Sequence, residues 1–190
     1  MFSFCVSLLL FLSILVYLYD GCSAKPNWEA TPLSIGGTTT NPSAMDMDLR
    51  IERISRSEFG FSGTFFWNID MEDSVMVEMR ILSSHSGDEA DYKMTPWSIP
   101  QQKFTDYIDT FYKDMLRPNL GNCTDMPVYD SGYVPPWPKM TFTFNRCTLN
   151  GQGLPDIVAE GFYRGEAIIN AQPTVEVNVS ATLRIKTKFF

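Results

Sequence analysis

The chain has 190 residues and a formal net charge of −7. An acidic chain without a Lys/Arg cluster is a poor binder of nucleic acid and of anionic membranes, so the composition argues against both as partners. Aromatic residues make up 14% of the chain and there are 10 methionines, which is rich in large apolar side chains.

The first predicted element is a signal peptide over residues 1–24. Its apolar run, Phe4 to Tyr19, is shorter than the roughly 20 apolar residues that a membrane span needs. Ser23 and Ala24 are small residues that suit a cleavage site before Lys25. The alternative is an uncleaved anchor. After cleavage we expect no transmembrane segment, and residues 25–190 form a single domain of a secreted, extracellular protein.

Alternation of apolar and polar residues predicts the next elements. Residues 25–43 are rich in Thr, Gly and Pro and are expected to be irregular. Strands are then predicted at 47–54, 59–69 and 74–82, with a weaker candidate at 92–97.

One segment has a helical period instead. Apolar residues recur at spacings of three and four from Phe104 to Met115, which predicts an amphipathic helix over about residues 99–116. The expected end signals are Ser98 and Gln101 as a capping box at the start, and Pro118 and Gly121 at the finish.

Strands resume at 139–147, 161–170 and 174–188. In the last of these, apolar residues from Val175 to Ile185 occupy one face and polar residues the other. Seven or so short strands of this kind with one helix predict an all-β fold, either an antiparallel β-sandwich or a β-cup with an apolar cavity.

Two further features agree with export. Cys123 and Cys147 remain after signal cleavage and most simply form one disulfide in an oxidising compartment. The triplets "NCT" and "NVS" predict glycosylation at Asn122 and Asn178, the latter on the polar face of its strand.

No pattern asks for catalysis, so we expect a protein that is not an enzyme and has no cofactor. His85 is the single histidine, and no nucleophile-elbow motif accompanies the serines around it. A hydrolase centred on His85 is the weakest alternative. The acidic clusters at 70–73 and 88–91 lack the spacing of a calcium loop, and one histidine with two paired cysteines cannot supply a zinc site.

The stretch "EFGFSGTFFWNID", residues 58–70, concentrates aromatic side chains on one strand face. Such a row fits a plain hydrophobic core as well as the wall of a pocket. On composition alone the plain core is favoured.

The order of motifs resembles a known family. "FTDYIDTFYKDML", "NCTDMP", "KMTFTFNRC" and above all "GLPDIVAEGFYRGEA" are similar to the insect CheA/CheB chemosensory proteins, nearer the CheA type. These are relatives of the GM2 activator and the MD-2-related lipid-recognition group. The resemblance covers most of the chain after the signal peptide. It departs in one respect, because the GM2 activator has several disulfides and this chain offers one, so glycolipid specificity is not carried over.

The resemblance implies a β-cup and a secreted binder or presenter of a hydrophobic ligand (a lipid, fatty acid or hydrocarbon) in chemosensation, including pheromone detection. The alternative is an extracellular interaction module that modulates a membrane receptor or an ion channel of the degenerin type. In that case Trp137, in the proline-rich "SGYVPPWP", is the expected contact.

The predicted ligand-binding residues form three groups. One wall is expected to consist of Phe59, Phe61, Phe65 and Trp67. The opposite wall is expected to consist of Val77, Met79, Phe142 and Phe144. The rim or lid is expected to consist of Trp97, Phe111 and Trp137.

Overall fold

The computed structural model describes residues 26–56, 58–70, 74–129, 131–171 and 175–188. The predicted signal peptide, residues 1–24, lies outside the described residues. The elements in chain order are β1 (Trp28–Thr39), β2 (Met45–Arg53), β3 (Phe59–Trp67), β4 (Met76–Ser84), the 3₁₀ turn η1 (Glu89–Asp91), β5 (Lys93–Met94), β6 (Ile99–Lys103), α2 (Phe104–Tyr107), η2 (Ile108–Leu116), α3 (Arg117–Leu120), β7 (Met140–Cys147), β8 (Gly161–Ala171) and β9 (Val175–Thr187).

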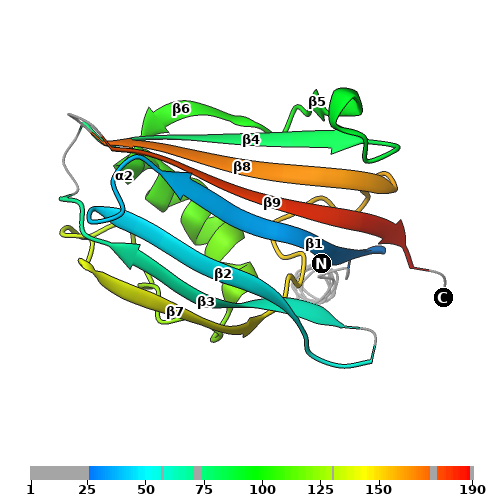
Figure 1. The fold of residues 1–190 in the computed structure, drawn as a ribbon, viewed down its shortest axis with the longest axis horizontal. Helices are drawn as coiled ribbons and strands as arrows, with labels where there is room; N and C mark the ends of the chain where they lie inside the picture. Colours follow the sequence, from blue (N-terminus) through cyan, green and yellow to red (C-terminus); the bar gives the residue numbers. More distant parts are fainter. Residues whose placement is uncertain (1–25, 57, 71–73, 130, 172–174, 189–190) are drawn as a thin grey trace, which may run out of the picture.

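The strands form two antiparallel sheets that face each other (Figure 1). The large sheet has the order β1-β9-β8-β4-β5, and β6 also pairs with β4. The small sheet has the order β2-β3-β7. The predicted antiparallel sandwich of mostly β structure is therefore confirmed.

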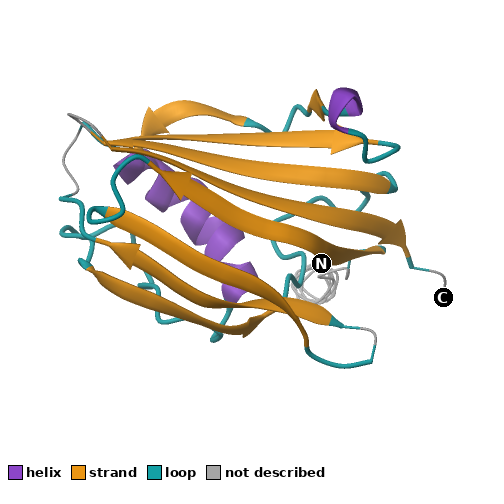
Figure 2. Cartoon of the chain, viewed as in Figure 1, coloured by secondary structure: helices purple, strands orange, loops and turns teal. Residues whose placement is uncertain are grey.

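The sheets meet along one side and are bridged by the helix on the other. β1 and β2 lie side by side, which joins the sheets at that edge (Figure 1). α2 contacts β4 and β6, at the far edge of the large sheet. Beyond α3, the Cys123–Cys147 disulfide and an isolated bridge between Thr124 and Phe144 attach the chain to β7. The helix thus spans the open side between the sheets (purple in Figure 2).

The helix is continuous from Phe104 to Leu120 but is not uniform. Its central part, η2, is a π-helix, in which the Arg117 N–H donates to the Tyr112 carbonyl five residues earlier. Pro118 lies where η2 passes into α3 and supplies no N–H to the helix, and Gly121, with φ of 54° and ψ of −131°, follows its last residue.

The predicted helix start at residue 99 is wrong. Residues 99–103 form β6 instead, because they pair with β4, and no side chain caps the helix at its N-cap, Lys103. Ser98, expected as the cap, accepts the Ile81 N–H through its Oγ at 2.9 Å. The expected strand at 92–97 is reduced to the two residues of β5.

The prediction of an irregular segment at 25–43 is also wrong. β1 runs from Trp28 to Thr39 along β9, and a break in the register between Pro32 and Ser34 accommodates the proline. Among the described strands, β1 pairs with β9 alone, so its proline and glycines lie in an edge strand, the place in a sheet that tolerates them best.

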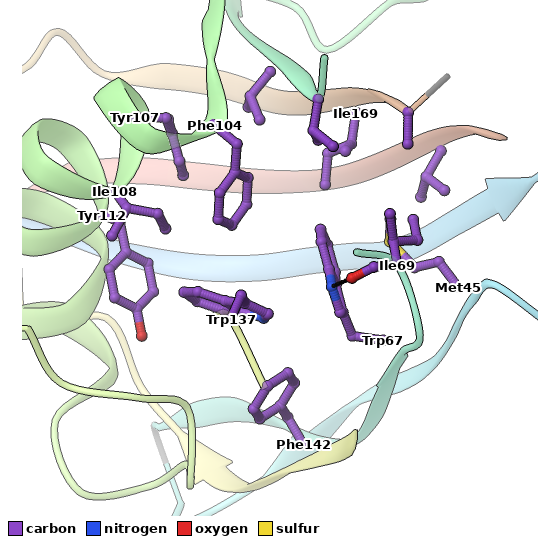
Figure 3. Close-up of a cluster of buried hydrophobic side chains, with 14 of the residues drawn as sticks. Met45, Trp67, Ile69, Phe104, Tyr107, Ile108, Tyr112, Trp137, Phe142 and Ile169 are labelled. Atoms are coloured by element: carbon purple, nitrogen blue, oxygen red, sulfur yellow. Dashed lines mark hydrogen bonds between the residues drawn. The ribbon is translucent and has the colours of Figure 1, made fainter. Parts of the chain in front are cut away.

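The largest core cluster fills one end of the space between the sheets (Figure 3). Trp137, from the segment before β7, lies at its centre. The ring centroid of Trp137 is 5.2 Å from that of Phe104, 5.5 Å from that of Tyr112 and 5.9 Å from that of Phe142. This end of the molecule is packed solid by aromatic side chains.

Candidate functional site

Along the strands of the large sheet, the side chains on the inner face change from large to small. Val77, Ile169 and Val177 form one cross-strand row and are all buried against the aromatic core. The next two rows contain small residues, namely Ala167, Gly165 and Ala181. A Cβ added at Gly165 would meet no heavy atom within 4 Å. The small side chains therefore leave space between the sheets.

The inner face of the small sheet is ordered in the same way. Trp67, Phe65 with Phe142, and Phe144 belong to the rows at the packed end. The following row consists of Ile51, Phe61 and Cys147. This last row faces the part of the large sheet that has the small side chains.

The space between these rows is a cavity of about 600 Å³. Its volume lies within the range of small-molecule sites. Its interior wall is mostly apolar and comes from both sheets and the helix, with Ala30, Ile35, Ile51, Phe61, Met79, Tyr107, Leu116, Leu120, Gly165, Ala167, Val179, Ala181 and Leu183 among the lining residues.

The cavity opens at the end of the molecule where β1 begins and β9 ends (right in Figure 1). We call the exposed lining residues there the mouth: Glu29, Ser55, Glu58, Phe59, Leu149, Asn150 and Lys188. Phe59 is 38% exposed and Leu149 is 37% exposed. The mouth therefore combines apolar side chains with a few charges.

One side of the mouth is a loop that follows β7 and is fixed to the end of the helix. Asn119, a buried residue near the helix C-terminus, donates through Nδ2 to the Met115 and Gln152 carbonyls, at 2.7 and 2.6 Å. Its Oδ1 accepts the N–H of Gly151 at 2.8 Å. Trp28 Nε1 donates to the Pro155 carbonyl at 2.8 Å from the opposite side. These bonds hold Leu149 and Asn150 at the mouth.

Tyr107 is a polar residue within the mostly apolar interior. It projects from α2 into the space between the sheets (Figure 3), is 7% exposed and lines the cavity. Its hydroxyl forms no hydrogen bond with the described residues. Burial raises the pKa of Tyr107 to about 12, so the hydroxyl is protonated at neutral pH and can donate a hydrogen bond.

Three of the eleven predicted ligand-binding residues line this cavity: Phe59, Phe61 and Met79. The others lie elsewhere. Phe65, Trp67, Val77, Phe142 and Phe144 belong to the packed core, where Trp67 and Phe142 are fully enclosed. The expected placement of Phe142 and Phe144 opposite Phe61 is wrong, because β7 pairs with β3 in the same sheet. Contact of these residues with a ligand stays a prediction.

The three residues expected at a rim or lid are dispersed. Trp137 is 3% exposed at the centre of the core, and the half-buried Phe111 packs against that core. Trp97 is 41% exposed and stacks on Tyr163, with ring centroids 6.2 Å apart. None of the three belongs to the lining of the cavity. The burial of Trp137 also removes the reason to expect it in a contact with another protein.

The cysteine prediction is confirmed. Cys123 and Cys147 form a disulfide with a Cα–Cα distance of 5.3 Å, and Cys147 lines the cavity. Of the predicted glycosylation sites, Asn122 is exposed in the turn after the helix. Asn178 is half-buried in β9 between Thr38 and Ile168. Glycan occupancy at both stays a prediction.

The surroundings of His85 are those of an exposed loop. Within the described part of the chain, it forms no hydrogen bond with Ser83, Ser84 or Ser86. Ser84 Oγ accepts the Gly87 N–H, and Ser86 Oγ donates to Asp91. The described residues contain no group of three or more His, Cys, Asp or Glu that could hold a metal ion.

Several cavity residues are not among the predicted ligand-binding residues, which all have large side chains. Gly165, Ala167 and Ala181 line the cavity, and the sequence signal for them is the occurrence of small residues at inner positions of paired strands. Leu116, Leu120 and Tyr107 belong to the helix stripe that was predicted, but the period does not tell which members of a stripe face a cavity.

No curated protein matches the chain. Among the described residues, no helix is long and apolar enough to span a membrane. Residues 77–165, which run from β4 through the helix and β7 into β8, match the model of the family DUF1091, described as a protein of unknown function. The matched segment contributes the helix and part of both walls of the cavity.

Proposed function

We propose that the protein is a secreted binder or presenter of a hydrophobic ligand, and not an enzyme. The observation that carries this proposal is the cavity of about 600 Å³ between the sheets, with Gly165, Ala167 and Ala181 in its wall. Small residues that face empty space do not stabilise a β-sandwich, because apolar side chains that filled the space would add packing contacts and raise the free energy of unfolding.

The energetics suit a flexible apolar chain. Burial of apolar surface yields about 25 cal/mol per Å², so ten buried methylenes contribute about 8 kcal/mol before the costs of association. Such a ligand needs surface area from the wall and few directed contacts. Lipids, fatty acids and hydrocarbons all meet this description.

The proposed extracellular location and chemosensory role rest on observations other than the cavity. The Cys123–Cys147 disulfide is consistent with an extracellular protein. The chemosensory role rests on the resemblance to the CheA/CheB proteins. The alternative role, modulation of a receptor or a degenerin-type channel, is compatible with ligand binding if the loaded cup is what the partner recognises.

The test is to fill the cavity at Gly165. Gly165→Phe places a ring in the open space between the sheets, and we expect the affinity for a fluorescent apolar probe to fall at least tenfold, about 1.4 kcal/mol. Gly36→Phe is the matched control, because a Cβ at Gly36 also meets no atom within 4 Å but Gly36 pairs with Ser180 on the polar face.

Native mass spectrometry of the secreted protein completes the test. We expect a bound lipid or hydrocarbon in the wild type and in Gly36→Phe, and its loss in Gly165→Phe. Equal loading of the two variants would contradict the proposal, as would a folded wild type that carries no lipid and takes up no apolar probe.

A further inference from the structure

The interior of the cavity has a hydrogen-bond donor without an acceptor. The Tyr107 hydroxyl forms no hydrogen bond with the described residues, although Tyr107 is only 7% exposed. The other tyrosines of the helix and of β8 differ: Tyr112 donates to the Pro127 carbonyl and Tyr163 to the Ala159 carbonyl. The Tyr107 hydroxyl is not among the fully enclosed polar atoms that lack a partner, so it is accessible from the cavity that Tyr107 lines and can donate to an acceptor on a bound molecule.

The charges of the cavity lie at its mouth and are unbalanced. Glu29, Glu58 and Lys188 are its charged lining residues, and all three are exposed. Lys188 Nζ also donates to the Pro26 carbonyl at 3.4 Å. A ligand carboxylate at the mouth would therefore meet two carboxylates for one ammonium group. A carboxylate in the interior would find no cation and would lose its hydration.

We propose that the cavity selects an uncharged chain that carries one hydrogen-bond acceptor, such as a long-chain ester or ketone, and that Tyr107 donates to this acceptor. This inference rests on the proposed function and narrows its ligand class. An alkane of the same length fills the apolar wall but leaves the hydroxyl unpaired. A fatty-acid anion is disfavoured both in the interior and at the mouth.

The experiment compares three probes with equal chain length: hexadecane, methyl palmitate and palmitate. Each displaces a fluorescent apolar probe from the wild type at neutral pH. We expect methyl palmitate to bind about tenfold tighter than hexadecane, since one buried hydrogen bond contributes about this factor. We expect palmitate to bind at least tenfold more weakly than its ester.

Tyr107→Phe removes the hydroxyl and keeps the ring. We expect this variant to lose the tenfold preference for the ester over the alkane while its affinity for hexadecane stays within twofold of the wild type. Tyr163→Phe is the control, because the hydroxyl of Tyr163 is already paired and Tyr163 does not line the cavity. It should retain the preference for the ester.

The outcomes separate this inference from the function on which it rests. If none of the probes binds the folded protein, the proposed function fails. If hexadecane and methyl palmitate bind equally and Tyr107→Phe changes neither affinity, the protein remains an apolar binder but the role of Tyr107 is overturned. Tighter binding of palmitate than of its ester would overturn the preference for uncharged ligands.

Discussion

Gly63 of β3 allows a close approach of β2 on one side and lies next to a β-bulge with β7 on the other. Its φ of 141° is a conformation that side chains rarely adopt, and a Cβ there would collide with the carbonyl oxygen of Asp48 in β2. On the other side, two residues of β7 oppose one residue of β3, and Arg146 takes a φ of 54°. The bulge turns the end of β7 so that Cys147 comes to line the cavity.

Gly63→Ala should therefore lower the free energy of unfolding by about 3 kcal/mol, from backbone strain together with the collision. Gly121→Ala separates these causes, because Gly121 also has a positive φ of 54° but a Cβ there meets no atom within 4 Å. We expect a loss of about 2 kcal/mol for Gly121→Ala in urea denaturation, because φ of 54° with ψ of −131° is a backbone conformation that side chains disfavour. Equal losses would show that the contact with Asp48 adds nothing.

At the scale of the elements, the helix is joined to the loop after β7 by contacts that the sequence pattern does not reveal. The helix and the loop after β7 are separate in the sequence, and Asn119 connects them through two hydrogen bonds, to the Gln152 carbonyl and from the Gly151 N–H. Sequence reasoning placed the helix stripe but not this side chain, since a buried asparagine has no periodic signal. Buried Asn119 and exposed Asn150, which donates to the Pro118 carbonyl, thus fix to the helix the loop that shapes one side of the mouth.

Asn119→Ala should destabilise the protein by about 2 kcal/mol, because the buried N–H of Gly151 loses its acceptor. Hydrogen exchange of the Gly151 amide should accelerate more than that of amides in β8. Asn150→Ala is the control: its side chain is exposed, donates to the Pro118 carbonyl and accepts the Gln152 N–H, so a loss below about 1 kcal/mol is expected. Unchanged exchange at Gly151 in Asn119→Ala would refute the role of Asn119.

At the scale of the whole molecule, alternation predicted which faces of the strands point inward but not where along a strand the interior is filled. The strands β2, β3, β4, β7, β8 and β9 were all expected, with ends shifted by a few residues. Phe61 and Trp67 share one face of β3, yet Phe61 faces the cavity and Trp67 is enclosed in the core. That difference depends on which cross-strand rows lie opposite, which is long-range information.

β1 and β6 were missed for a related reason. In β1 the proline and the two glycines have the local signature of a loop, whereas residues 99–103 of β6 were predicted to be the start of the helix. The pairing with β9 and with β4 outweighs these local signals. Local propensity is a weak guide where an edge strand gains a full ladder of hydrogen bonds from a neighbour that lies far along the chain.

The division into a packed end and a hollow end predicts how two phenylalanines of the small sheet differ. Phe142 is completely buried, with aromatic neighbours that include Phe65 and Trp137. Phe142→Ala should lower the free energy of unfolding by about 4 kcal/mol, since the rigid surroundings leave a cavity behind. Phe61 lines empty space on one side, so Phe61→Ala loses fewer contacts and should cost about 2 kcal/mol or less.

Ligand binding should reverse this order. Phe61→Ala removes part of the cavity wall, and we expect it to weaken the binding of an apolar probe about tenfold. Phe142→Ala leaves the wall intact, so its affinity at a temperature where the protein is folded should match the wild type. Both properties are measured on lipid-free protein, by urea denaturation and probe titration. If the two variants lost stability and affinity in the same proportion, the interior would be one continuous core, and the aromatic row of β3 would be packing along its whole length.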